Sequence, residues 1–278
     1  MKLSDFKKIF YNNLSEYYSE RSLRFLYKIS IINICKIQET EILINERFIE
    51  KSELSVLKRV IEKLRLQMPI EYIFKETEFL GNKILLNNKV FIPRPETEEL
   101  TRWVLAEESN KQKLNIIDLC SGSGCIALSL AQKTNHQISA VDKSQNAVKI
   151  ANKNFQYHNV KVKCINQDIL RSELKEKYDV MISNPPYVPN SEEKNMKKNV
   201  LSYEPKSAIF VQDKHPLLFY DRILYLSKKY LNKKGAIYFE IHQDFANNIE
   251  KLIKSYNFKN YIFKKDFYNK YRMVKIKS

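Results

Sequence analysis

Glycine and proline are scarce in this chain, since only four of its 278 residues are glycine and eight are proline. This composition excludes a collagen-like chain and a Gly/Pro-rich low-complexity chain. At 44% hydrophobic residues, the sequence is typical of a globular protein that is long enough to bury a sizeable core. Each glycine that is present frees the backbone locally and each proline fixes it, so these few residues indicate specific local conformations.

Long apolar runs and paired cysteines are also missing. No hydrophobic run reaches the ~18 residues that a membrane-spanning helix needs. The first ten residues, MKLSDFKKIF, lack the apolar region and the cleavage site of a secretory signal. The four cysteines form no Cys-x-x-Cys pair, and the four histidines have no metal-ligand spacing. We therefore expect a cytoplasmic protein with reduced thiols, no bound metal and no membrane partner.

Acidic residues are in the minority. Lys and Arg total 48 against 32 Asp and Glu, which gives a formal net charge of +16 at pH 7. A basic surface attracts nucleic acid at long range. An AT-rich genome would produce the same excess of lysine, asparagine and isoleucine over glycine. Both explanations remain open, and the charge alone names no partner.

The first 75 residues have a helical pattern. Apolar side chains recur at helical spacing around Ser4, a suitable N-cap, at Leu3, Phe6, Phe10, Leu14 and Tyr17. A second amphipathic helix, with Leu54, Leu57, Ile61 and Leu64 on its apolar face, should end before Pro69. We expect residues 1–75 to form a small helical domain. In residues 76–95, short strand-like runs alternate with the turn-prone pairs GN and NN, so we expect a β-hairpin linker.

Residues 96–278 alternate strands and helices. The strands are predicted at LNIIDL, QISAVD, VKVKCINQD, YDVMISN, GAIYFEI and YRMVKIK, and a long polar loop is predicted over 188–210. Strand–helix alternation predicts an α/β domain in which helices cover both faces of a parallel sheet. Ligands of such sheets bind beyond the carboxyl ends of the strands. The residues that follow each strand are therefore the candidate site residues.

The turn DLCSGSG joins the first of these strands to a helix. Gly122 and Gly124 would let the backbone approach a ligand closely, and the helix N-terminus offers free N–H groups. The turn matches neither the dinucleotide fingerprint nor the P-loop. Taken alone, it could equally be a tight turn without a ligand.

The next two strands also end in acids. Asp142 ends QISAVD, at the place where an acid accepts hydrogen bonds from ribose hydroxyls. Asp168 ends the third strand and could lie beside an adenine ring, with Ile169 against the face of that ring. Either acid alone could simply cap a helix. Together with a glycine turn that lacks phosphate-binding residues, they indicate S-adenosylmethionine, which carries no phosphate.

The fourth strand ends in SNPPYVP. An amide nitrogen is a poor nucleophile because its lone pair is delocalised. The side-chain oxygen of Asn184 and the carbonyl of Pro185 could accept its two hydrogens, which would free the lone pair and direct it at a sulfonium methyl group. The rigid Pro185–Pro186 pair would hold that carbonyl in place, and Tyr187 could stack on the flat substrate group. Catalysis would then rest on positioning and preorganised electrostatics; the alternative is a proline-stiffened turn.

Taken together, these residues resemble the release-factor glutamine methyltransferase family. Its members are class I S-adenosylmethionine-dependent enzymes that methylate the glutamine of the Gly-Gly-Gln motif in peptide chain release factors. The resemblance covers nearly the whole chain. Its more specific mark is FIPRPETEEL, which precedes NPPY by about 90 residues, because NPPY alone occurs in other amino-group methyltransferases. The resemblance implies a Rossmann-like α/β fold with a parallel-rich seven-stranded sheet, preceded by the helical domain and the hairpin linker.

The resemblance also implies site residues. The cofactor-binding residues would be Cys120, Ser121, Gly122, Ser123, Gly124, Asp142, Asp168, Ile169 and Asn184. The substrate amide would be held by Asn184, Pro185, Pro186 and Tyr187, of which Asn184, Pro185 and Tyr187 would be catalytic. Two positions depart from the family pattern. Cys120 stands where glycine is frequent, which is tolerable if φ there is negative, and Ile169 stands where some members place an aromatic residue against the adenine.

The family further implies a protein substrate, a release factor, which residues 1–75 would help to dock. We expect a monomer without a nucleic-acid substrate. Three rival functions remain. A glutamine methyltransferase of a ribosomal protein shares NPPY but typically lacks PRPETE. An adenine-N6 DNA methyltransferase usually has a sizeable target-recognition region, whereas the fold uses all of the residues after Tyr187. A non-catalytic RNA-binding module would not need an intact NPPY segment beside Asp142.

Overall fold

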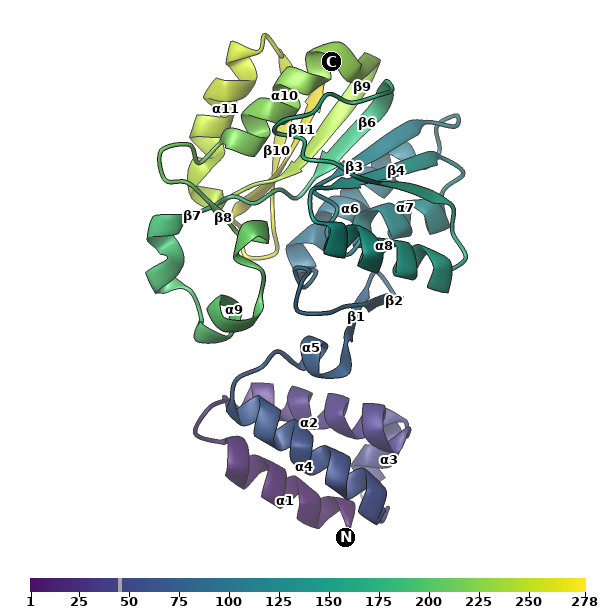
Figure 1. The fold of residues 1–278 in the computed structure, drawn as a ribbon, viewed down its shortest axis with the longest axis vertical. Helices are drawn as coiled ribbons and strands as arrows, with labels where there is room; N and C mark the ends of the chain where they lie inside the picture. The colour runs from purple at the N-terminus through teal and green to yellow at the C-terminus, as the bar shows by residue number, and fades with distance from the viewer. Residues whose placement is uncertain (45–46) are drawn as a thin grey trace. The chain divides into compact units, whose positions relative to one another are not determined.

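A computed structural model describes residues 1–44 and 47–278 (Figure 1). These residues form two compact units. The first comprises Met1–Lys75 and Lys197–Tyr203, and the second comprises Glu76–Met196 and Glu204–Ser278. Each unit has its own hydrophobic core.

The first unit is helical. Its helices are α1 (Leu3–Leu14), α2 (Glu20–Cys35), α3 (Glu39–Ile44), α4 (Lys51–Arg65), α5 (Ile70–Phe74) and α9 (Lys198–Tyr203). The predicted apolar positions of α1 are buried, except that Tyr17 lies beyond the helix and is exposed. Helix α4 ends before Pro69 as predicted, with Leu57, Ile61 and Leu64 buried.

The predicted N-cap of α1 is wrong. Lys2 occupies the cap, so Ser4 lies inside the first turn. The side chain of Leu3 is fully buried, and its N–H donates to the carbonyl of Arg47 at 2.9 Å. Tertiary packing of Leu3 therefore starts the helix ahead of the residue with the better capping side chain.

The second unit is built on a seven-stranded sheet in the order β10-β11-β9-β6-β3-β4-β5. The strands are β3 (Asn115–Leu119), β4 (Gln137–Asp142), β5 (Val162–Asn166), β6 (Tyr178–Ser183), β9 (Leu231–Glu240), β10 (Asn260–Lys265) and β11 (Tyr271–Lys277). Strands β9, β6, β3, β4 and β5 are parallel, and β11 runs antiparallel to both β9 and β10. The predicted parallel-rich α/β sheet is confirmed; β10, a polar edge strand, was not predicted.

Helices cover both faces of this sheet (Figure 1). One face carries α6 (Pro95–Glu108), α7 (Cys125–Lys133) and α8 (Gln145–Tyr157), and the other carries α10 (Leu218–Tyr230) and α11 (Ala246–Ser255). Ser144 caps α8, since its Oγ accepts from the N–H of Ala147 at 3.3 Å. Because the five parallel strands share one direction, their carboxyl ends lie along one edge of the sheet.

Three shorter features complete the second unit. The hairpin of β1 (Glu76–Phe79) and β2 (Asn82–Leu85) turns at Leu80 and Gly81, whose φ angles are 51° and 81°. Two positive φ angles are the pattern of a tight hairpin turn that follows the strand twist. The segment predicted as a polar loop contains β7 (Val188–Pro189) and β8 (Phe210–Val211), which pair with each other. It also contains the short 3-10 helices 190–195 and 206–208, whereas its helix α9 belongs to the first unit.

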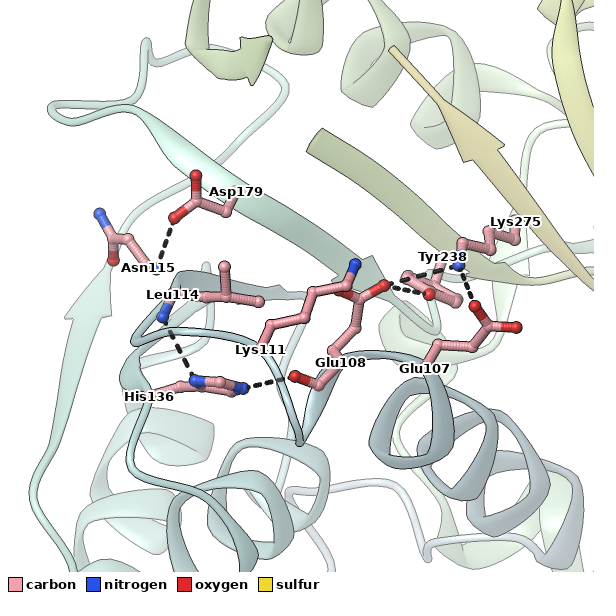
Figure 2. A network of polar contacts seen from close by, with 9 residues as sticks. All are labelled: Glu107, Glu108, Lys111, Leu114, Asn115, His136, Asp179, Tyr238 and Lys275. Carbon is pink, nitrogen blue, oxygen red and sulfur yellow. Dashed lines mark hydrogen bonds and ion pairs between the residues drawn. The ribbon is translucent and has the colours of Figure 1, made fainter. Parts of the chain in front are cut away.

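A buried polar cluster fixes the C-terminal end of α6 (Figure 2). The ammonium of Lys275, whose side chain is 2% exposed, lies 2.7 Å from Glu107 and 3.5 Å from Glu108. The hydroxyl of Tyr238 donates to Oε1 of Glu108 at 2.6 Å. Since Tyr238 belongs to β9 and Lys275 to β11, these contacts join the end of α6 to two strands of the sheet.

Candidate functional site

The predicted cofactor turn, Cys120–Gly124, follows β3 directly. Cys120, Gly122 and Gly124 all have positive φ, at 62°, 56° and 78°. The condition under which cysteine is readily tolerated at position 120, a negative φ, is therefore not met. A left-handed conformation costs a non-glycine residue about 1–2 kcal/mol. Despite this cost, Cys120 packs against the hydrophobic core of the second unit.

The two glycines of the turn have different roles. A Cβ on Gly124 would lie 2.7 Å from the ring of Phe155 and 3.0 Å from Cβ of Ala151, so a side chain there would separate α7 from α8. A Cβ on Gly122 would meet no atom within 4 Å. Gly122 thus satisfies the backbone conformation and leaves free space above the turn, as a bound ligand would require.

Asp142 lies directly beside this free space. Its Oδ2 accepts from the N–H of Gly122 at 2.8 Å, and its Oδ1 accepts from the N–H of Ser144 at 2.8 Å. Each carboxylate oxygen has a second lone pair, so Asp142 can still accept from the hydroxyls of a ribose. Burial raises the pKa of Asp142, while the two backbone hydrogen bonds oppose that shift.

The structure places the other acids differently. Asp118 is fully buried beneath the turn, where Oγ of Ser121 donates to it at 2.6 Å. Asp168 is half-buried, and its Oδ1 accepts from the N–H of Leu170 at 3.0 Å. Ile169 is 3% exposed and belongs to the hydrophobic core. The turn and Asp142 are therefore in direct contact, whereas no hydrogen bond among the described residues joins Asp168 to either of them.

The segment NPPY follows β6, which pairs with β3. Asn184 is half-buried, and its Nδ2 donates to Oγ1 of Thr97 at 2.9 Å. Pro185 and Pro186 are buried, and the carbonyl of Pro185 accepts no hydrogen bond from any described residue. The hydroxyl of Tyr187 donates to Oε1 of Glu240 at 3.1 Å. The side-chain nitrogen of Asn184 thus already donates a hydrogen bond, to Thr97. Its side-chain oxygen and the carbonyl oxygen of the next residue, Pro185, can each still accept one.

Two residues of this arrangement were not predicted as site residues. They are Thr97, within the PRPETE segment, and Glu240, within the predicted strand GAIYFEI. The hydroxyl of Thr97 donates to Oε2 of Glu240 at 2.7 Å, and Glu240 is 1% exposed. The clue in the sequence was a single acid inside the apolar strand AIYFEI, because a buried carboxylate needs partners.

Further contacts support NPPY and the PRPETE segment. The ring of His242 lies 5.9 Å from that of Tyr187, and its Nε2 is 3.4 Å from Glu192. Arg94 forms an ion pair with the buried Glu204, which also accepts from the N–H of Ile92 at 3.3 Å. The contacts of Glu204 connect the PRPETE segment with the SYEP segment, residues 202–205.

The two available oxygens of Asn184 and Pro185, which follow the carboxyl end of β6, could together bind an NH₂ group and present its nitrogen to a group donor. Within residues 1–44 and 47–278, no three His, Cys, Asp or Glu side chains form a group that could hold a metal ion. In the same ranges, no helix is both long and apolar enough to span a membrane.

Comparison with known sequences gives a consistent result. The family described as "Methyltransferase small domain" matches residues 96–205. A release factor glutamine methyltransferase of Flavobacterium psychrophilum is 36% identical over 99% of this chain and 99% of its own length. An enzyme of the same name from Bacteroides thetaiotaomicron is 33% identical over 90% of this chain and 84% of its own length.

Solved structures show the same fold at lower identity. A methyltransferase from Pyrococcus furiosus is 15% identical, with a TM-score of 0.53 over 74% of this chain and 93% of its own. A ribosomal protein L11 methylase from Lactobacillus delbrueckii subsp. bulgaricus is 16% identical, with a TM-score of 0.50 over 69% of this chain and 81% of its own. These similarities concern the fold, whereas the sequence relatives match almost the full chain.

Proposed function

The chain belongs to the release factor glutamine methyltransferase family, and from this premise we propose the reaction that it catalyses. The protein transfers a methyl group from S-adenosylmethionine to the side-chain amide nitrogen of the glutamine in the Gly-Gly-Gln motif of peptide chain release factors. The C–S bond of the donor breaks as the C–N bond forms, so S-adenosylhomocysteine leaves and the nitrogen loses one proton to solvent. The observation that carries this proposal is the pattern of hydrogen bonds around NPPY. The Asn184 oxygen and the Pro185 carbonyl are both available as acceptors, while the nitrogen of Asn184 is engaged by Thr97.

The cofactor site fits the adenosyl group. Asp142 would accept hydrogen bonds from the ribose hydroxyls, and the turn from Cys120 to Gly124 would lie along the ligand, with free space above Gly122. Asp168 and Ile169 would lie near the adenine, although only a small part of Ile169 is exposed. When bound, S-adenosylmethionine supplies an electrophilic methyl group on a positively charged sulfur.

The chain's own contribution is to hold a flat amide in one orientation. Asn184 Oδ1 and the Pro185 carbonyl would each accept one hydrogen of the substrate NH₂ group. Two fixed acceptors that draw these hydrogens out of the amide plane would make the nitrogen more pyramidal, which opposes delocalisation of its lone pair into the substrate carbonyl. Pro186 stiffens the backbone behind Pro185, and the ring of Tyr187, held by Glu240, offers a face to the amide. The contribution is therefore orientation and preorganised electrostatics.

Residues 1–75 would help to dock the protein substrate. They form most of the first compact unit, which has its own hydrophobic core. Removing them should raise KM for a whole release factor more than KM for a short Gly-Gly-Gln peptide. An equal rise in both would mean that this segment supports the fold and does not bind the substrate.

Two related reactions are the alternatives. A ribosomal-protein glutamine and the adenine N6 of DNA also present a flat NH₂ group, so NPPY alone cannot distinguish them. The relatives that match over almost the full chain favour the release factor. A release-factor substrate also implies a cytoplasmic enzyme.

The test is to incubate the protein with S-adenosylmethionine labelled in its methyl group and, separately, with release factor, ribosomal protein and DNA. Mass spectrometry then locates the label. Label on the Gly-Gly-Gln glutamine is the expected result, and label only on ribosomal protein or DNA would overturn the proposal.

A further inference from the structure

A chain of three hydrogen bonds supports the proposed substrate clamp, which consists of the side chains of Asn184 and Tyr187 and the carbonyl of Pro185. Asn184 donates from Nδ2 to Thr97 at 2.9 Å, and Thr97 donates to Oε2 of Glu240 at 2.7 Å. Tyr187 donates to the other carboxylate oxygen of Glu240 at 3.1 Å. One buried carboxylate thus holds both side chains of NPPY that are proposed to touch the substrate, the first through a threonine and the second directly.

The direction of this chain follows from the chemistry of its members. An ionised carboxylate accepts hydrogen bonds and donates none. A threonine hydroxyl has a single hydrogen, so Thr97 gives it to Glu240 and offers only lone pairs to Asn184. The amide of Asn184 must then turn its NH₂ group toward Thr97 and its oxygen away from it. That oxygen is the acceptor that the proposed clamp requires.

The surroundings of Glu240 make this direction sensitive to protonation. Burial raises the pKa of Glu240 to about 7, while hydrogen bonds from Thr97 and Tyr187 oppose the shift. Two charged groups also act on Glu240, since Glu96 of α6 raises its pKa and Arg272 of β11 lowers it. From α10, the hydroxyl of Tyr220 donates to the backbone carbonyl of Glu240 at 3.0 Å. A protonated Glu240 could donate to Thr97, and the hydroxyl of Thr97 would then be free to point elsewhere.

Helix α6 is fixed to β9 at both of its ends. Thr97, in its first turn, contacts Glu240, and Glu108, at its last residue, contacts Tyr238. Tyr238 and Glu240 are two residues apart on one strand, so their side chains lie on the same face of the sheet. The helix is therefore fixed to the sheet at both ends, and this attachment determines the position of the Thr97 hydroxyl.

From these contacts we propose that Thr97 and Glu240 are positioning residues that set the orientation of the Asn184 amide and hold Tyr187 beside it. The inference rests on the proposed function and extends it, because it assigns a task to the PRPETE segment and to the buried acid of β9. Neither residue touches the reacting atoms. Their effect passes through Asn184 and Tyr187.

The experiment first compares three single variants of α6 in the full-length protein. Thr97→Val removes the hydroxyl and keeps the shape, and Thr97→Ser restores the hydroxyl. Thr101→Val is the matched control, because Thr101 is equally buried on the same helix and its hydroxyl donates only to the carbonyl of Thr97, at 2.8 Å. For each variant, kcat on a Gly-Gly-Gln peptide, the Kd of S-adenosylhomocysteine and the NMR signals of the Asn184 side-chain amide are measured.

Thr97→Val should lower kcat by about tenfold or more, which is less than the ~10²-fold loss for a hydrogen-bonding group at the reacting centre, because Thr97 acts only through Asn184. The Kd of S-adenosylhomocysteine should be nearly unchanged. Thr97→Ser should recover most of the turnover, and Thr101→Val should behave like the wild type. The Asn184 amide protons should exchange with solvent faster in Thr97→Val alone. In the wild type, kcat should fall as the pH decreases through about 7, and this dependence should disappear in Glu240→Gln.

Equal turnover in Thr97→Val and Thr101→Val would overturn the inference, as would unchanged exchange of the Asn184 amide. If the wild type methylates neither peptide nor release factor, the proposed function fails. The exchange measurement needs no substrate, so it still decides whether Thr97 orients Asn184.

Discussion

The backbone N–H of Gly122 donates to Oδ2 of Asp142 at 2.8 Å. This hydrogen bond ties the glycine turn after β3 to the acid that ends β4, and the second oxygen of Asp142 is held by the N–H of Ser144. The carboxylate therefore has a fixed position before any ligand binds. A pre-positioned acceptor saves the cost of ordering a side chain on binding.

Asp142→Ala should chiefly weaken cofactor binding. Hydrogen bonds to a charged group contribute about 1.5–3 kcal/mol each, so the Kd of S-adenosylhomocysteine should rise by at least about tenfold. Asp221→Ala, which removes the same charge from the exposed side of α10, is the control. Isothermal calorimetry on both variants gives the answer, and an unchanged Kd in Asp142→Ala would refute the ribose assignment.

Asn184→Ala should act on turnover. Losing a preorganised hydrogen-bonding group at the reacting centre typically lowers kcat by about 10²-fold or more, and we expect a smaller change in cofactor affinity. Asn184→Asp is informative beside it, because aspartate keeps the shape but cannot donate to Thr97. Single-turnover kinetics and calorimetry separate the two effects. Equal losses in turnover and in cofactor affinity would contradict a role in holding the substrate amide.

Asp118 gives a prediction for stability against pH. Burial raises its pKa to about 7, while the hydrogen bond from Ser121 opposes the shift. A raised pKa means that the fold disfavours the ionised form. Asp118 therefore destabilises the protein as the pH rises from its ordinary pKa of 3.8 to about 7, and the full cost remains above that pH.

Asp118→Asn should remove this cost. Each unit of pKa shift corresponds to about 1.4 kcal/mol, so the variant should be more stable than the wild type by a few kcal/mol at pH 8 and by much less near pH 4. Urea unfolding at the two pH values measures the difference. A stability difference that does not depend on pH would show that Asp118 keeps its ordinary pKa.

The buried cluster at the end of α6 offers a second stability test (Figure 2). Glu108→Ala leaves the ammonium of Lys275, 2% exposed, with Glu107 as its remaining carboxylate partner, and takes away the acceptor of Tyr238. Breaking a buried ion pair from one side typically costs about 3–5 kcal/mol. Glu107→Ala is the matched control, because the side chain of Glu107 is 43% exposed and should cost less. Equal losses in urea unfolding would mean that burial does not determine the energy of this cluster.

The regular part of the second unit could be predicted because its strands are apolar, short and followed by turn residues. QISAVD and YRMVKIK match β4 and β11 residue for residue. The edge strand β10 escaped prediction because NYIFKK is largely exposed, so its hydrophobic pattern is weak. Helix α9 belongs to a segment that looks like a polar loop, and it forms where that segment joins the helices of the first unit.

The part of the candidate site that directly follows strands could be predicted from the sequence. The turn, Asp142 and Asn184 lie at the carboxyl ends of strands, and their residue types at these places predicted them. The partners of Asn184 could not be found this way, since Thr97 precedes it by 87 residues and reaches it only through the packing of α6. The sign of φ at Cys120 was also beyond sequence reasoning, because contacts with the core help decide whether a cysteine accepts a left-handed backbone.

The central claim is that two fixed oxygens grip a flat amide next to a methyl donor. A crystal structure of the protein with S-adenosylhomocysteine and a Gly-Gly-Gln peptide tests it most directly. We predict that Asn184 Oδ1 and the Pro185 carbonyl each lie within hydrogen-bonding distance of the glutamine side-chain nitrogen, and that this nitrogen faces the sulfur. A glutamine side chain bound elsewhere, or residue 184 far from the sulfur, would contradict the account.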